Sequence, residues 1–187
     1  SYLRKLNKVG KVGIIGHSEG GTIAFMMGAE KSIDFLVSLA GSAANGIDVI
    51  VGQNEAMMQQ QGVPQEIIGN YAKALRILYK DRVEGKEIND PVRYTEDLCN
   101  AENLTLPDAL KTNLSKCASA GGEWFTWFLG YSPAEAIRKV ACPVMALNGT
   151  LDLQVLSRDN IPVIRDNLPS NSKNIIREYE SLNHLFQ

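Results

Sequence analysis

The stretch Lys11-Val-Gly-Ile-Ile-Gly-His-Ser-Glu-Gly-Gly21 decides the fold of this chain. Its first half is apolar and β-branched, as in a strand that is buried on both faces. Gly16–Gly20 then fits the pattern Gly-x-Ser-x-Gly, and the residues that follow have helical character. A serine at such a strand-to-helix turn adopts a strained conformation that holds its hydroxyl clear of the sheet. We therefore predict that Ser18 is a nucleophile and that side chains at the two flanking glycines would collide with the packed strand and helix. The alternative is a serine that only caps the helix.

Composition excludes several classes of protein. The chain has 187 residues, 44% of them hydrophobic, which suffices for a domain with a real core. Its net charge of −2 gives no basic surface for nucleic acid, and no apolar run approaches the ~20 residues of a membrane span. The cysteines (Cys99, Cys117 and Cys142) lack metal-ligand spacing, and there are only two histidines. We expect no metal site and ordinary buried thiols, with a Cys99–Cys117 disulfide left open.

The order of elements predicts an α/β fold. A second buried strand, at 33–40, follows the first helix, and strand–helix–strand order argues for a parallel sheet with a right-handed crossover. From about residue 48 to about 140 the pattern is mostly helical, and strands resume at 142–149 and 174–179. The expected core therefore has four strands, at about 11–16, 35–40, 143–148 and 174–180.

A serine nucleophile needs a base, and an acid that orients the base. Of the two histidines, His17 is adjacent to Ser18 and its ring should project away from the hydroxyl, so His184 is the predicted base. Asp152 follows a strand at the end where functional residues of parallel sheets collect, so it is the predicted acid. The alternatives are a surface histidine at 184 and a helix-capping aspartate at 152.

The order Ser18, Asp152, His184 resembles that of the α/β-hydrolase superfamily. Gly16-His-Ser-Glu-Gly20 looks like its nucleophile elbow, Pro143–Val155 like the strand and loop of its acid, and Leu182–Gln187 like its histidine loop, as in bacterial serine esterases and lipases with a helical cap. The resemblance implies the C-terminal part of that fold: a mostly parallel core at 1–47 and 141–187, and a helical cap inserted at 48–140. The first strands and the last helix of the family have no counterpart here.

The resemblance implies a carboxylesterase-like serine hydrolase that cleaves a small acyl ester through an acyl-enzyme, with no cofactor. The backbone N–H of Glu19 would form part of the oxyanion hole. Further candidates for substrate contacts are His17, Trp124, Trp127 and Phe128, although the aromatic residues are expected chiefly to fill the cap core. Acyl transfer, thioester hydrolysis, peptide hydrolysis and a non-catalytic binding domain remain alternatives.

A parallel sheet that begins at its nucleophile strand exposes an edge and an apolar face. We therefore expect a further N-terminal segment or a second copy of the chain to cover that edge. The sequence contains nothing that assigns a cellular compartment.

Overall fold

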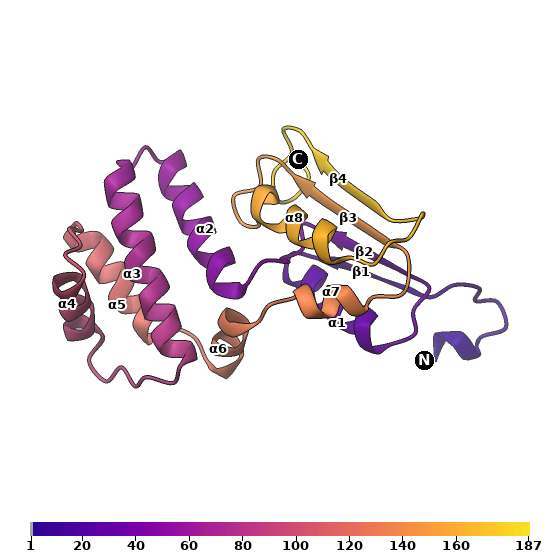
Figure 1. Cartoon of the computed structure of the whole chain (residues 1–187), viewed down its shortest axis with the longest axis horizontal. Coiled ribbons are helices and arrows are strands. Elements are labelled where there is room, and N and C mark those ends of the chain that lie inside the picture. The colour runs from indigo at the N-terminus through magenta and orange to yellow at the C-terminus, as the bar shows by residue number, and fades with distance from the viewer. Residues whose placement is uncertain (1) are drawn as a thin grey trace. The chain divides into compact units, whose positions relative to one another are not determined.

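The computed structural model describes residues 2–187, and Figure 1 shows their arrangement. One parallel sheet has the strand order β1-β2-β3-β4, with bounds Gly13–His17, Phe35–Leu39, Val144–Gly149 and Ile175–Tyr179. These bounds confirm the four predicted strands. A short 3-10 helix, η1, spans Leu3–Lys5. The α-helices are α1 (Glu19–Glu30), α2 (Gly46–Gln60), α3 (Gln65–Val83), α4 (Pro91–Ala101), α5 (Asp108–Ser119), α6 (Glu123–Gly130), α7 (Ala134–Lys139) and α8 (Ser157–Asn167).

The chain divides into two compact units, 1–44 with 132–187 and 45–131. In the first unit, helices α1, α7 and α8 cover one face of the sheet (Figure 1). Alternate strand residues such as Leu36, Val144 and Ala146 are buried on that face against Phe25 and Ile161. The strand period of two therefore decides which side chains form this core.

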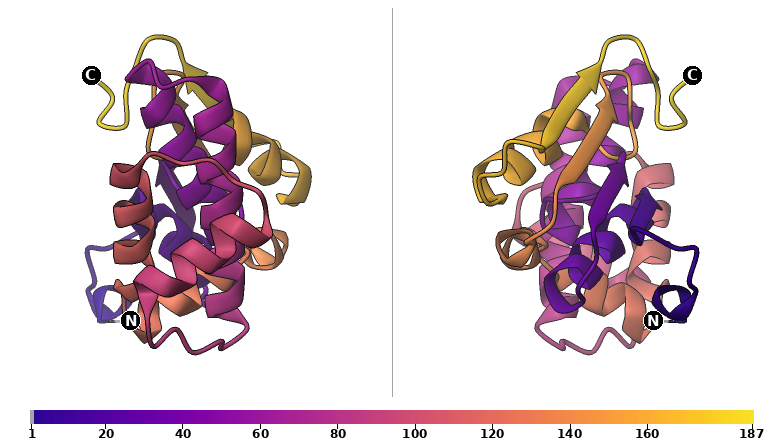
Figure 2. Two further views of the ribbon diagram at one scale, coloured as in Figure 1. Left: turned by 90° about the vertical axis from the view of Figure 1, so that its left-hand side faces the viewer. Right: turned by 90° about the vertical axis from the view of Figure 1, so that its right-hand side faces the viewer.

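The opposite strand positions are more exposed. Ile15 of β1 is 66% exposed and Ile175 of β4 is 46% exposed. Strand β1 has one neighbour, β2, and so lies at an edge of the sheet. The strands can be seen side by side in the right-hand view of Figure 2. The expected apolar edge strand is thus present in this unit.

The second unit contains helices α2 to α6. The apolar stripe of α3 is buried along its length, and its residues form a core cluster with Leu114 and Leu129. Spacings of three and four place this stripe on one helix face. Its buried members are Ile68, Tyr71, Ala72, Ala74, Leu75, Leu78 and Tyr79.

The predicted boundaries between core and cap were wrong by several residues. The second unit begins at 45 rather than 48, and it ends at 131 rather than 140. Helix α7 belongs to the first unit because Ile137 and Val140 are buried in the core beside the sheet. Composition does not reveal this, since α7 is as helical in pattern as the helices before it.

The expected aromatic core face of α6 was also wrong. Trp124 and Trp127 are 52% and 45% exposed, whereas Phe125 and Leu129 contact the core cluster. Phe125 lies edge-on to Tyr79, with ring centroids 5.7 Å apart. The helix is therefore rotated so that its larger indole rings lie outside the core of this unit.

Three further features complete the description. Helix α8 continues through Pro162, which lies inside it. All three cysteines are free; Cys99 is buried, which raises the pKa of its thiol, and Cys117 and Cys142 are half-buried. No helix within residues 2–187 combines the length and the apolar character needed to cross a bilayer.

Candidate active site

Ser18 lies in the turn between β1 and α1 with φ 56° and ψ −125°. This region is sparsely populated for a residue other than glycine and costs on the order of 1–3 kcal/mol. The backbone hydrogen bonds of Ser18 hold it there: its N–H donates to Leu39 O (2.9 Å), and its carbonyl accepts from Gly21 N (2.9 Å). The strained turn required by a nucleophile elbow is therefore present.

Close packing explains two of the glycines at this turn. A Cβ on Gly16 would lie 1.9 Å from the carbonyl oxygen of Gly20, and one on Gly21 would lie 2.6 Å from the Cα of Gly41. A Cβ on Gly20 itself would meet nothing within 4 Å. The prediction for the flanking glycines thus holds at Gly16 and fails at Gly20, where Gly21 takes the tightly packed position.

His184 and Asp152 lie together in the loops after β4 and β3. Nδ1 of His184 is 2.8 Å from Oδ2 of Asp152, and both side chains are buried. A carboxylate only accepts hydrogen bonds when ionised, so Nδ1 carries the proton and donates. The tautomer is fixed in this way, and Nε2 is left as the basic nitrogen of His184.

Four N–H donors face the Asp152 carboxylate. Oδ1 accepts from the backbone N–H groups of Gln154 (2.8 Å) and Val155 (2.9 Å). Oδ2 accepts from Nδ2 of Asn148 (3.2 Å) in addition to His184. These donors stabilise the negative charge and hold the carboxylate plane in one orientation. Asn148 lies within β3, and its type and position gave no sequence signal for this role.

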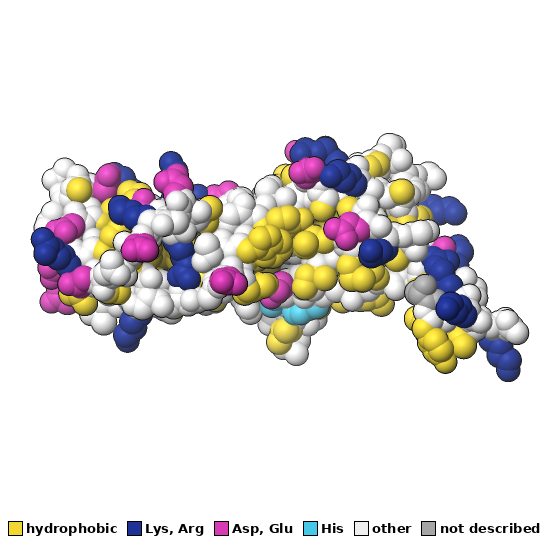
Figure 3. Space-filling view, turned by 90° about the horizontal axis from the view of Figure 1, so that it is seen from below, with side chains coloured by type: hydrophobic (Ala, Val, Ile, Leu, Met, Phe, Trp, Pro, Cys, Tyr) yellow, Lys and Arg dark blue, Asp and Glu magenta, His cyan; other side chains and the backbone are white. Residues whose placement is uncertain are grey.

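His17, which precedes Ser18, contacts the histidine loop. Its Nε2 lies 2.9 Å from the carbonyl oxygen of His184, and the two rings lie 4.7 Å apart between centroids. A carbonyl accepts hydrogen bonds only, so Nε2 of His17 is the donor. Figure 3 shows histidine side chains at the surface with hydrophobic side chains beside them. The structure thus places His17 against His184.

The hydroxyl of Ser18 forms no hydrogen bond with His184 within the described residues 2–187. Catalytic hydrogen bonds are often long or misaligned until substrate binds, so this geometry does not exclude a nucleophile–base pair. Glu19 begins α1, and the first backbone N–H groups of a helix have no intrahelical partner. The N–H of Glu19 is therefore free to donate next to Ser18.

Asn160 holds the loop of small residues after β2. Its Oδ1 accepts from the N–H groups of Ala43 (2.7 Å) and Ala44 (3.0 Å), and its Nδ2 donates to Leu156 O (2.8 Å). The asparagine is 1% exposed. Thr22 adds a second tie, since its hydroxyl donates to Ser42 O (2.7 Å). This loop is anchored next to the nucleophile turn by residues that sequence reasoning missed.

The aromatic candidates lie in the second unit. Trp124 stacks on Phe128 with centroids 5.6 Å apart, and Trp127 stacks on Tyr131 at 4.7 Å. Phe128 is half-buried. These residues therefore form two stacked pairs within their own unit. Among residues 2–187 no group of three or more His, Cys, Asp and Glu side chains is placed to hold a metal ion.

Comparisons with known proteins bear on the fold. Residues 1–93 match the family model "BAAT / Acyl-CoA thioester hydrolase C terminal", a range that contains β1, the Ser18 turn and β2. The chain is also similar in structure to VinJ, with a TM-score of 0.50 and 16% identity, covering 98% of this chain and 62% of VinJ. The chain has an α/β-hydrolase fold.

Two other solved structures are similar to this chain. A 2,6-dihydroxy-pseudo-oxynicotine hydrolase has a TM-score of 0.47 and 15% identity, covering 98% of this chain and 37% of that one. A monoacylglycerol lipase from Paleococcus ferrophilus has a TM-score of 0.42 and 15% identity, covering 91% of this chain and 58% of that one. The chain thus spans less than two thirds of each of the three solved proteins named here. No curated protein matches it in sequence.

Proposed function

We propose that this chain carries the catalytic residues of a serine hydrolase that cleaves an ester or thioester acyl bond. The supporting observation is the buried pair of His184 and Asp152, 2.8 Å apart, whose tautomer leaves Nε2 basic. The strained turn at Ser18 and its neighbour His17, in contact with the same histidine loop, support the same assignment.

The proposed reaction has two halves. The Ser18 hydroxyl oxygen attacks the acyl carbonyl while Nε2 of His184 takes the hydroxyl proton. The imidazolium then gives that proton to the departing alcohol or thiol, and an acyl-serine remains. Water enters, loses a proton to Nε2 and attacks the acyl carbonyl. The bond to the Ser18 oxygen then breaks, the imidazolium returns its proton to that oxygen, and a carboxylic acid leaves. Asp152 stabilises the imidazolium in both halves through the Nδ1 proton.

The carbonyl oxygen becomes an oxyanion in each half and needs donors. The backbone N–H of Glu19 supplies one, reinforced by the partial positive charge at the start of α1. Removal of a single donor of this kind costs ~10²–10³ in rate elsewhere. The second helical unit, 45–131, would act as the cap that limits substrate size.

The proposal includes both ester and thioester bonds because the sequence pattern and the family model point to different ones. The sequence pattern resembles that of esterases. The family model that matches residues 1–93 instead has a thioester hydrolase in its description. Both bonds use the same nucleophile, base and acid, and they differ in the leaving group. Substrates that share one acyl group and differ only in the leaving group therefore distinguish esterase from thioesterase activity.

The test compares p-nitrophenyl butyrate with butyryl-CoA as substrates for the native chain and for Ser18→Ala. Turnover of at least one substrate that falls by ~10⁴ or more in Ser18→Ala is expected. Ser32→Ala is the matched control, because Ser32 is an exposed serine of the same unit. Equal turnover by the native chain and Ser18→Ala would contradict the proposal.

A second candidate is a non-catalytic binding domain with an α/β-hydrolase fold. It is favoured by one observation, the lack of a hydrogen bond between the Ser18 hydroxyl and His184 among residues 2–187. A folded chain that hydrolyses neither substrate and does not react at Ser18 with a fluorophosphonate would support this candidate.

A further inference from the structure

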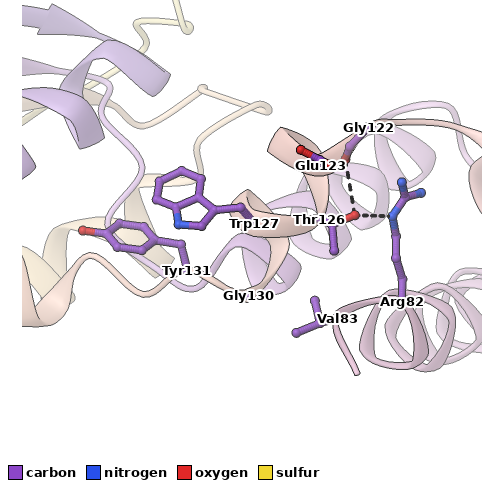
Figure 4. Close-up of a pocket in the computed structure, with 8 residues that line it drawn as sticks. All are labelled: Arg82, Val83, Gly122, Glu123, Thr126, Trp127, Gly130 and Tyr131. Carbon is purple, nitrogen blue, oxygen red and sulfur yellow. Dashed lines mark hydrogen bonds between the residues drawn. The ribbon is translucent and has the colours of Figure 1, made fainter. Parts of the chain in front are cut away.

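The second unit contains an open pocket of about 790 Å³ between the end of α3 and helix α6 (Figure 4). Arg82 and Val83 line it from α3, and Trp127 and Tyr131 line it from α6 and the residue after it. A volume of this size is in the range of small-molecule sites. Neither the family model nor the serine chemistry accounts for it.

The guanidinium of Arg82 is fixed in place at this pocket. Its Nε donates to the hydroxyl of Thr126 (2.8 Å), and its Nη1 donates to the carbonyl of Ala120. The same group lies over the ring of Phe125, 5.6 Å from the centroid. A guanidinium held in this way loses little further entropy when it binds an anion.

Arg82 has no carboxylate partner inside the described part of the chain. No ion pair within 4.0 Å joins it to an aspartate or glutamate of residues 2–187. Its hydrogen bonds go to neutral oxygen atoms, which leave the positive charge uncompensated. A carboxylate is the natural partner of such a group, because the planar fork matches its two oxygens.

The other wall of the pocket is apolar. Trp127 is 45% exposed and stacks on Tyr131 with centroids 4.7 Å apart, and Val83 is 40% exposed. Figure 4 shows the indole of Trp127 and the guanidinium of Arg82 on opposite sides of Thr126. The pocket therefore offers a flat apolar surface and a fixed cation to the same ligand.

We propose that this pocket binds an amphipathic monocarboxylate, with its carboxylate on Arg82 and its aryl or alkyl body against Trp127. Glu123 also lines the pocket and adds one negative charge, which disfavours ligands with a second anionic group. This proposal goes beyond the hydrolase function and does not depend on it, since every residue that it uses belongs to the second unit.

The chain provides its own reporter for binding. Its two tryptophans are Trp124 and Trp127, so Trp124→Phe leaves Trp127 as the single indole. We would titrate this variant with 3-phenylpropionate and with its neutral analogue 3-phenylpropanamide, exciting the indole selectively. The expected result is a saturable change in emission, with the carboxylate bound at least tenfold more tightly than the amide.

Arg82→Gln should abolish the preference for the carboxylate while the amide binds as before. Arg93→Gln, which removes an exposed arginine from α4 of the same unit, is the matched control and should change neither affinity. Glu123→Gln tests the charge argument in a chain with Arg82 intact, and it should tighten carboxylate binding several-fold.

Three results would overturn the proposal. These are a titration with no saturable change, equal affinity for carboxylate and amide in the native pocket, and an Arg82→Gln variant that keeps the tenfold preference. If Arg82→Gln loses its helical circular dichroism, the Glu123→Gln comparison decides, and unchanged or weaker carboxylate binding then contradicts the assignment. None of these measurements requires an active Ser18.

Discussion

His17 donates from Nε2 to the carbonyl oxygen of His184 over 2.9 Å, which joins residues 167 positions apart in the chain. The bond connects the residue before Ser18 to the backbone of His184. Since Nδ1 of His184 is held by Asp152, the ring and the backbone carbonyl of His184 are each held by one hydrogen bond. The Ser18 turn and the loop of His184 are therefore positioned relative to each other within one unit.

Loss of the His17 bond should slow the reaction of Ser18 without abolishing it. A net hydrogen bond is worth about 0.5–1.5 kcal/mol, so His17→Ala should lower the rate of fluorophosphonate labelling by roughly 2- to 10-fold. His17→Gln, which retains an N–H donor, should recover much of the rate. Labelling of His17→Ala at the native rate would argue against a positioning role.

An independent readout is available for the same variants. The chain has two histidines, so His17→Ala leaves His184 as the only imidazole in the NMR spectrum. The Nδ1 proton bonded to Asp152 should remain far downfield in this variant, because Asp152 does not contact His17 through any hydrogen bond among residues 2–187. Its disappearance would mean that His17 supports the fold of the loop rather than its position.

Asp152→Asn should reduce kcat of the proposed hydrolysis by about 10⁴-fold, because an amide at this site favours the wrong tautomer of the base. Two of the four donors that face Asp152 would also meet an NH2 group, because each carboxylate oxygen accepts from two of them. Steady-state kinetics on p-nitrophenyl butyrate measure the effect. Asp166→Asn, at an exposed site on α8, should be neutral. A similar loss in both variants would contradict the role of Asp152.

Asn160→Ala should destabilise the first unit. The substitution leaves the buried N–H of Ala43 and the half-buried N–H of Ala44 without their acceptor, and a buried unsatisfied group costs about 1–3 kcal/mol. Denaturant unfolding followed by circular dichroism measures the difference. Arg158→Ala, on the exposed side of the same helix, should change stability by less than about 0.5 kcal/mol.

Protonation of the Asp81 carboxylate should make the second unit less stable at low pH. Partial burial acts to raise its pKa, but hydrogen bonds from Lys86 (2.6 Å) and Tyr94 (2.8 Å) outweigh it and hold the pKa below its ordinary value. A lowered folded-state pKa gives stability that is full above the unfolded value of about 3.9 and is lost as the pH falls through the folded value.

Asp81→Asn therefore tests this carboxylate directly. The variant should be less stable than the native chain by roughly 1–2 kcal/mol at pH 7, and the difference should shrink to near zero at pH values below the folded pKa. Urea unfolding at a series of pH values gives the comparison. A stability difference between the two proteins that stays constant down to pH 2 would show that the altered side-chain group, rather than its lost charge, destabilises the variant.

The sequence predicts the strands well and their surroundings less well. β-Branched runs between turn residues placed all four strands to within two residues, because buried parallel strands have little freedom in composition. The unit boundary at 131 was missed by nine residues, because α7 resembles the helices before it and differs only in what it packs against. Helix α4 was not distinguished within the helical region for the same reason.

In the candidate site, too, some features could be predicted from the sequence and others could not. The positions of Ser18, Asp152 and His184 were predictable because each follows a strand, and parallel strands bring their carboxyl ends to one edge; their catalytic roles stay a prediction. The contributions of Asn148, Asn160 and His17 depend on side-chain directions that no spacing encodes. The exposed face of α6 was mistaken for its core face, since Phe125 and Leu129 form an equally valid stripe.

The measurement that tests the central proposal most directly is the site of reaction with a fluorophosphonate, read by intact mass and peptide mapping. The account predicts one adduct per chain, on Ser18, in the native protein and in Ser32→Ala. It predicts no adduct in Ser18→Ala and a strongly slowed reaction in Asp152→Asn. A folded native chain that forms no adduct, or forms one at another serine, would contradict the assignment of Ser18, His184 and Asp152 as a catalytic triad.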